Sequence, residues 1–182
     1  MKTRTLLALF LALTVARVLP GRELIIDEDR SYIRFAVAAT GHHVEGHVIS
    51  FQAEIDLDSG QDFPRSATLR FAARQLTTEH EERDAEMYKW LEVDKYPNVI
   101  FKMDALEGRG STRVAHGSLT FHGVTRSIDI PVTLSSVGPV ITLTGETEVN
   151  TRSFRLSQFR RALVMTVSED VAITFTLVGR LE

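Results

Sequence analysis

Apolar residues at every second position constrain the fold of this chain more than any other feature. The alternation is plain at Ile33, Phe35 and Val37, and it returns near the C-terminus at Ile173 and Phe175. Because successive side chains of a strand point to opposite faces, this period predicts strands with one buried face. Such segments follow one another along the chain, which predicts eight or nine strands in an antiparallel all-β fold.

One long segment, residues 44–57, changes its apolar phase partway. Val44 and Val48 share one parity, whereas Ile55 and Leu57 share the other. A parity switch within a strand indicates a bulge or a sharp bend, which barrels use to curl. Residues 145–158 are polar and irregular, and they predict a strand edge followed by a long loop.

A helical segment interrupts the alternation between residue 78 and about residue 91. Thr78 and Glu81 have the spacing of a capping box. Met87 and Trp90 share a face by helical spacing. The sequence therefore predicts one short amphipathic helix that either covers one end of a barrel or packs on its outside.

An eight-stranded closed barrel has an interior that side chains can fill or that can hold one small ligand. Most alternating positions in this chain are apolar, so a cavity lined by them would be apolar and would suit an apolar guest. The predicted lining residues are Phe35, Val37, Phe51, Phe71, Met87, Trp90, Phe101, Met103, Phe121 and Phe175. The candidates for contacts with a polar head group at the mouth are Arg34, Tyr88, His116 and Arg155.

The N-terminus has the pattern of an export signal. Lys2 and Arg4 precede the apolar residues 5–16, which end in small residues at Ala16. We expect a signal peptide over residues 1–16, with cleavage as late as about residue 21, and a barrel domain over residues 22–181. The apolar run is shorter than the roughly 20 residues that span a bilayer, and an uncleaved N-terminal anchor is the alternative.

The composition of the chain indicates in which cellular compartment it works and which binding partners are not expected. The chain has no cysteine, which excludes disulfides and thiolate metal sites and fits a bacterial periplasm. Its net charge is −3 with both signs spread along the sequence, so no basic face is expected for nucleic acid. The sequence leaves open whether the chain is a monomer or a homodimer.

Catalytic motifs are not apparent. No phosphate-binding glycine loop or activated nucleophile occurs, and no cofactor is expected. His43, Glu45 and His47 alternate along one strand and could present three metal ligands, but a solvated polar face explains them more simply. His122 occupies a predicted tight turn, where local hydrogen bonding is its expected role.

Three segments carry a resemblance to a known family. They are Arg83-Asp84 before the helix, Lys95-Tyr96-Pro97 with Phe101, and Gly117 to Arg126, which contains Leu119-Thr120 and His122-Gly123-Val124-Thr125. In this order they resemble the YceI-like family of polyisoprenoid-binding proteins over about residues 22–181. The resemblance implies a lipocalin-like barrel with an apolar cavity, a long isoprenoid guest, often with a quinone or phenol head, and export to the periplasm.

The chain departs from the family pattern at two places. The family usually has an Asp-Phe-Phe element before Tyr-Pro, where this chain has residues 90–94. The family also tends to show Asp-Phe-Gly, where this chain has Ser153-Phe154-Arg155. Arg155 thus occupies a position at which glycine would allow a tight backbone.

The functional expectation is binding of an isoprenoid or isoprenoid-quinone-type lipid for storage, transport or stress protection in the cell envelope. One alternative is a barrel enzyme, an isomerase or a hydrolase, which would need convergent polar groups inside the cavity. The other is a filled barrel that acts as an interaction protein without a lipid.

Overall fold

The computed structural model describes residues 22–57, 63–161 and 165–181, and most of them lie in strands. The signal peptide expected over residues 1–16 lies outside these ranges. The strands are β1 (Arg22–Ile26), β2 (Tyr32–Ala39), β3 (His42–Val48), β4 (Gln52–Leu57), β5 (Pro64–Ala72), β6 (Leu76–Thr77), β7 (Asn98–Arg109), β8 (Thr112–Phe121), β9 (Val124–Val137), β10 (Val140–Asn150), β11 (Arg160–Arg161) and β12 (Met165–Leu181). The helices are α1 (Glu81–Trp90) and the 3-10 turns η1 (Glu28–Arg30), η2 (Ala73–Gln75) and η3 (Thr151–Phe154).

Antiparallel pairing closes the sheet into a barrel. The strands pair in the order β1, β4, β5, β7, β8, β9, β10 and β12, and β12 pairs back to β1 through Leu24 opposite Leu181. Closure leaves no open edge in this ring, which removes the unpaired backbone groups of an edge strand. The prediction of an eight-stranded antiparallel barrel with one short helix is confirmed.

Three strands extend the barrel wall beyond the ring. β2 follows β1 and pairs with β12, β3 precedes β4 and pairs with β2, and β6 follows β5 and pairs with β3. The wall bends between Val48 and Gln52, where β3 ends and β4 begins. This bend lies within the segment whose apolar parity changes, so it agrees with the predicted bend.

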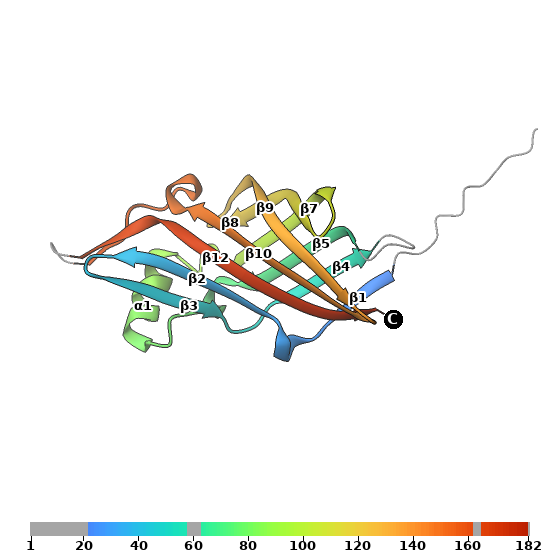
Figure 1. Cartoon of the computed structure of the whole chain (residues 1–182). Helices are drawn as coiled ribbons and strands as arrows, with labels where there is room; N and C mark the ends of the chain where they lie inside the picture. Colours follow the sequence, from blue (N-terminus) through green and yellow to red (C-terminus); the bar gives the residue numbers. More distant parts are fainter. Residues whose placement is uncertain (1–21, 58–62, 162–164, 182) are drawn as a thin grey trace, which may run out of the picture.

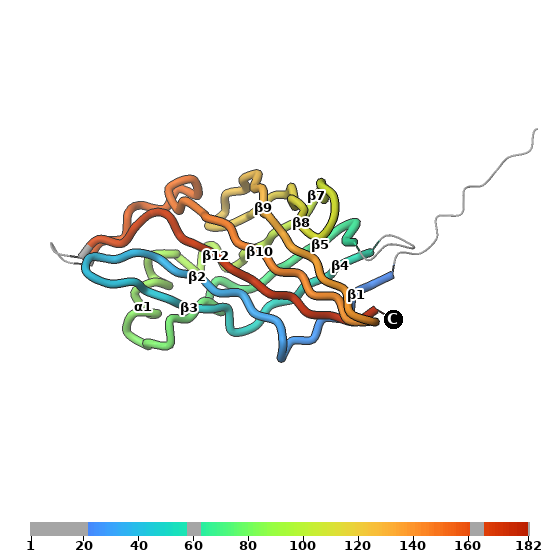
Figure 2. The backbone as a smooth tube through the Cα atoms, in the orientation of Figure 1, coloured from blue at the N-terminus to red at the C-terminus, as the bar shows by residue number. Residues whose placement is uncertain are grey.

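The two ends of the barrel differ. Figure 1 shows the strands converging near the C-terminus, while α1 and the β2–β3 hairpin lie at the opposite end. Figure 2 shows the same taper in the backbone. The converging end is filled by a core of Leu24, Ile55, Leu57, Leu134, Ile141, Leu143 and Leu177. A second buried cluster, which includes Leu91, Val93 and Leu156, packs beside α1 at the other end.

Two local predictions require correction. Helix α1 begins at Glu81 with His80 as its N-cap, so Thr78 is not the cap. β10 continues to Asn150, because it pairs with β12 at eleven successive positions, and the predicted irregular segment is strand up to that residue.

Within the described ranges, no helix has the length and apolar character that a membrane span requires.

Candidate ligand-binding cavity

A cavity of about 430 Å³ occupies the barrel between the packed core and α1. Ten strands and α1 contribute side chains to its wall, and most of these side chains are apolar. The volume falls within the roughly 300–1,000 Å³ of small-molecule sites. It also exceeds the roughly 150 Å³ apolar cavity that is known to hold benzene. The cavity can therefore enclose a substantial part of an apolar chain.

Nine of the ten predicted lining residues lie in the cavity wall. They are Phe35, Val37, Phe71, Met87, Trp90, Phe101, Met103, Phe121 and Phe175. The exception is Phe51, which packs against the core cluster at the converging end. Phe51 lies in the bend between β3 and β4, and the bend takes its side chain off the cavity wall.

Two phenylalanine rings of the wall lie against glycines of the neighbouring strand. Gly46 is the register partner of Phe35, and Gly145 is the partner of Phe175. A Cβ added at Gly46 would lie 2.2 Å from the Phe35 Cζ atom, and one added at Gly145 would lie 2.4 Å from the Phe175 Cζ atom. The missing side chains allow these rings to lie close to the wall and leave the cavity open.

Helix α1 forms the cavity wall at the wide end of the barrel with the side chains of one face, here called the cavity stripe. Its cavity residues, together with the N-cap, are His80, Arg83, Glu86, Met87, Trp90 and Leu91. The polar members precede the apolar members along the helix. His42, Thr147 and Ser168 add polar groups from strands near this end. The cavity is thus mostly apolar, and several of its polar side chains lie on or beside α1.

A buried carboxylate fixes the start of α1. Asp84 accepts hydrogen bonds from the Thr77 hydroxyl at 2.7 Å, the Thr78 hydroxyl at 2.5 Å and the Thr78 N–H at 2.9 Å. Burial acts to raise the pKa of Asp84, but these hydrogen bonds and the nearby Arg83 charge outweigh it and lower the pKa below its ordinary value. Asp84 therefore holds the β6–α1 turn as a carboxylate.

Tyr88, a predicted head-group contact, anchors α1 to the β5–β6 connection. Its hydroxyl donates to the Leu76 carbonyl at 2.7 Å and lies 3.1 Å from the Arg74 carbonyl. Burial and the Asp84 charge raise the pKa of Tyr88. The hydroxyl is engaged with the backbone, and Tyr88 is not part of the cavity wall.

The other three predicted head-group residues also lie away from the cavity wall. Arg34 stacks over the Tyr32 ring at 4.3 Å on the outer face of β2. His116 lies 2.7 Å from the Asp129 carboxylate on the outer face of β8 and β9. Arg155 ends η3 with φ of +63°. None of these three residues belongs to the cavity wall.

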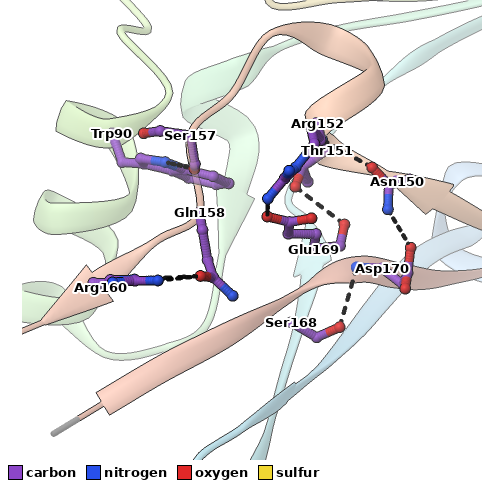
Figure 3. A network of polar contacts seen from close by, with 10 residues as sticks. All are labelled: Trp90, Asn150, Thr151, Arg152, Ser157, Gln158, Arg160, Ser168, Glu169 and Asp170. Atoms are coloured by element: carbon purple, nitrogen blue, oxygen red, sulfur yellow. Dashed lines mark hydrogen bonds and ion pairs between the residues drawn. The ribbon is translucent and has the colours of Figure 1, made fainter.

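The C-terminal end of α1 is held by a hydrogen bond of Trp90, and a network of polar contacts lies next to it. The Trp90 indole N–H donates to the Ser157 carbonyl at 2.8 Å, as Figure 3 shows. Beside it, Arg152 forms an ion pair with Glu169, and the Thr151 hydroxyl donates to the Glu169 carbonyl at 3.0 Å. These contacts join α1, η3 and β12 around the wide end of the barrel.

His122 makes long-range contacts rather than the expected local ones. One ring nitrogen lies 3.0 Å from the Phe154 carbonyl oxygen, and the other lies 3.2 Å from the Glu92 carboxylate. The Tyr96 ring packs on it with a centroid distance of 4.2 Å. The buried imidazole thereby connects the β8–β9 turn to η3 and to the end of α1.

The suggested metal ligands on β3 do not converge. Among the residues that the structure describes, no three His, Asp or Glu side chains gather in the geometry of a metal site. His47 instead lies 3.7 Å from the Glu79 carboxylate. His43 and Glu45 are exposed on the same strand.

These features define a class of protein: a closed eight-stranded β-barrel whose apolar interior is bounded at one end by a helix. Barrels of this size enclose one small ligand in several families. The chain belongs to the YceI-like family, because the family model of the YceI-like domain matches residues 25–179.

The chain is also similar in sequence to curated proteins and in fold to solved structures. A UPF0312 protein of Pseudomonas savastanoi pv. phaseolicola is 27% identical over 143 residues, covering 75% of this chain and 74% of the relative. BcnA of Burkholderia cenocepacia has a similar structure with a TM-score of 0.74, at 19% identity over 85% of this chain and 99% of that chain. A polyisoprenoid binding domain from Saccharophagus degradans aligns with a TM-score of 0.67, at 14% identity over 90% of this chain and 100% of that chain.

Proposed function

We propose that this protein binds a long-chain isoprenoid lipid, or an isoprenoid-quinone-type amphiphile, inside the barrel and does so without catalysis. The observation that carries the proposal is the cavity of about 430 Å³, whose wall is mostly apolar with polar side chains on and beside α1. An amphiphile with an apolar tail and a small polar head matches this distribution.

Burial of the tail would supply most of the affinity. Each buried CH₂ contributes up to about 0.8 kcal/mol. Immobilisation of a flexible chain and of the ligand as a whole opposes this gain, so affinity does not grow in proportion to length. A tail of a few isoprene units therefore suffices for useful binding, and longer tails would extend toward the mouth.

One solved structure with a similar barrel supports the same class of ligand. The structure from Saccharophagus degradans is described as a polyisoprenoid binding domain, and its barrel superimposes on this one over most of both chains. The export signal expected over residues 1–16 would deliver the barrel to the periplasm. There the protein would store, carry or protect such lipids within the cell envelope.

The direct test is identification of lipid that co-purifies with the protein. Protein purified from native membranes and periplasm would be extracted with organic solvent and analysed by mass spectrometry. Val37→Phe places a larger side chain in the cavity wall, and Ala38→Phe places the same ring on the exposed face of the same strand as a matched control. We expect an isoprenoid in the wild-type protein and in Ala38→Phe, with at least a tenfold smaller amount in Val37→Phe.

Two outcomes would overturn the proposal. One is the absence of isoprenoid from the folded wild-type protein, both as purified and after incubation with isoprenoid vesicles. The other is equal loading of Val37→Phe and Ala38→Phe, which would place the lipid outside the cavity. Circular dichroism of both variants would establish that each retains the strand content of the wild type.

A further inference from the structure

Among the described residues, Arg83 is the one arginine in the wall of a mostly apolar cavity, and Glu86 lies on the same side of α1. Arg83 lies on the cavity stripe of α1, one turn before Met87 and two turns before Trp90. Its Nε donates to the Thr78 hydroxyl at 2.7 Å, and its Nη2 donates to the Thr78 carbonyl at 2.8 Å. The guanidinium is therefore held in one orientation.

A buried acid supports this orientation. The Thr78 hydroxyl that accepts from Arg83 itself donates to Asp84 at 2.5 Å. The relay runs from guanidinium to hydroxyl to carboxylate, and the Asp84 carboxylate does not contact the guanidinium directly. Arg83 is thus preorganised without being neutralised by a bidentate ion pair.

The guanidinium retains hydrogen-bonding capacity. Arginine has five N–H donors, and two of those on Arg83 are engaged with Thr78. Within the described part of the chain, no carboxylate lies within 4 Å of the Arg83 guanidinium nitrogens. The remaining donors are therefore available to an acceptor from a ligand.

We propose that Arg83 is the head-group residue of this cavity and that it selects amphiphiles whose head carries acceptor oxygens, such as quinone carbonyl or phosphate oxygens. This inference rests on the proposed function. The tail lies along the apolar half of the α1 stripe, and the head oxygens accept from the free N–H groups of Arg83. His42 and His80 flank the same mouth.

Trp90 provides the measurement, because it is the single tryptophan of the chain and lies in the cavity wall. Its fluorescence would be titrated with three probes that share a short isoprenoid tail: a quinone, a prenyl monophosphate and a hydrocarbon without a head. The variants are Arg83→Gln, Arg83→Lys and Lys89→Gln. The last removes the same charge from an exposed position on α1 outside the cavity.

We expect Arg83→Gln to weaken the headed probes by about tenfold to a hundredfold, the range of a hydrogen bond to a charged group. Binding of the hydrocarbon should change less than twofold. Arg83→Lys should retain more affinity for the phosphate than for the quinone. Lysine keeps the positive charge but lacks the planar guanidinium, whose N–H donors have a fixed arrangement. Lys89→Gln should bind all three probes like the wild type.

The outcomes separate this inference from the proposed function. Equal losses for headed and headless probes in Arg83→Gln would show a structural role for Arg83 and would overturn the inference. Unchanged affinity for all probes would overturn it as well, while wild-type binding of the hydrocarbon would leave the proposed function intact. If no probe binds the folded wild type, both fail. A preference of the wild type for the quinone or for the phosphate identifies the source of the oxygens.

Discussion

At the residue scale, Arg155 adopts a backbone conformation that glycine would adopt at lower cost. Its φ of +63° and ψ of +21° place it in the left-handed region. A residue with a Cβ pays about 1–2 kcal/mol there. The Arg155 N–H closes η3 by donating to the Arg152 carbonyl at 3.0 Å, and that contact does not need the side chain.

We predict that Arg155→Gly stabilises the protein by about 0.5–1 kcal/mol. Relief of the left-handed strain exceeds the larger unfolded-state entropy of glycine. The measurement is the midpoint of urea unfolding. Arg160→Gly in β11 is the control, since the same change at a strand position should destabilise. A midpoint for Arg155→Gly at or below that of the wild type would contradict the assignment of strain.

Asp84 leads to a prediction with a defined pH dependence. We expect Asp84→Asn to cost about 1–3 kcal/mol at pH 7, because an amide cannot accept all three of the hydrogen bonds from Thr77 and Thr78. The folded-state pKa of Asp84 is lowered from its ordinary 3.8. Its contribution is therefore complete above the ordinary value and is lost as the pH falls through the folded pKa.

The measurement is the free energy of unfolding of wild type and Asp84→Asn at pH 7 and below pH 3. The difference between the two proteins should shrink at the lower pH. Asp94→Asn is the control, because Asp94 is exposed and its pairing with Arg74 contributes little. A difference that stays constant with pH would show that the Asp84 carboxylate does not stabilise the fold by its charge.

At the scale of elements, the alternating strands could be predicted from sequence and the polar cavity residues could not. Apolar parity identified the wall because each strand has one inward face, as Phe101 and Met103 show. β10 was underestimated because Thr147 is the inward residue between Glu146 and Glu148, so polarity hid the alternation. Arg83 was missed because helix phase had to be known before its side chain could be placed.

The paired glycines and phenylalanines give a prediction for the strands. We expect Gly145→Ala to move the Phe175 ring into the cavity, since the added Cβ would lie 2.4 Å from its Cζ atom. Overpacking of this kind costs about 1–3 kcal/mol. Lipid loading, measured by extraction and mass spectrometry, should fall as the ring occupies the space.

The double variant Gly145→Ala/Phe175→Leu tests the mechanism. Leucine lacks the ring that the new methyl group displaces, so loading should recover relative to Gly145→Ala alone. Failure of this recovery, with the double variant folded, would show that the alanine acts through the backbone. The nearest backbone atom to the added Cβ is the Pro131 carbonyl oxygen at 3.0 Å.

At the scale of the whole molecule, closure and taper explain why the cavity exists. β1 and β12 close the barrel where the strands converge, and the leucine-rich core there forms the floor of the cavity through Ile55, Leu143 and Leu177. At the other end the extended β2, β3 and β6 widen the wall, and α1 bounds the space. The sequence indicated both a barrel and a helix, but which end remained open depended on contacts between distant segments, such as Trp90 with Ser157.

This architecture predicts that stability depends on occupancy of the cavity. A ligand that binds only the folded state stabilises it by about 2.7 kcal/mol at a free concentration one hundred times Kd. Removal of the isoprenoid should therefore lower the urea midpoint of the wild type without changing the slope of the transition, because the core at the converging end stays packed. Adding the lipid back should restore the midpoint.

Val37→Phe provides the control for this effect, because its bulkier side chain narrows the cavity and it is expected to carry little lipid. Its midpoint should be the same before and after extraction, whereas that of Ala38→Phe should fall as the wild type does. If extraction lowers all three midpoints equally, the lipid stabilises the barrel from outside. If it lowers none of them, although mass spectrometry shows that lipid was removed, occupancy contributes nothing and the hollow barrel is stable through its wall and packed end alone.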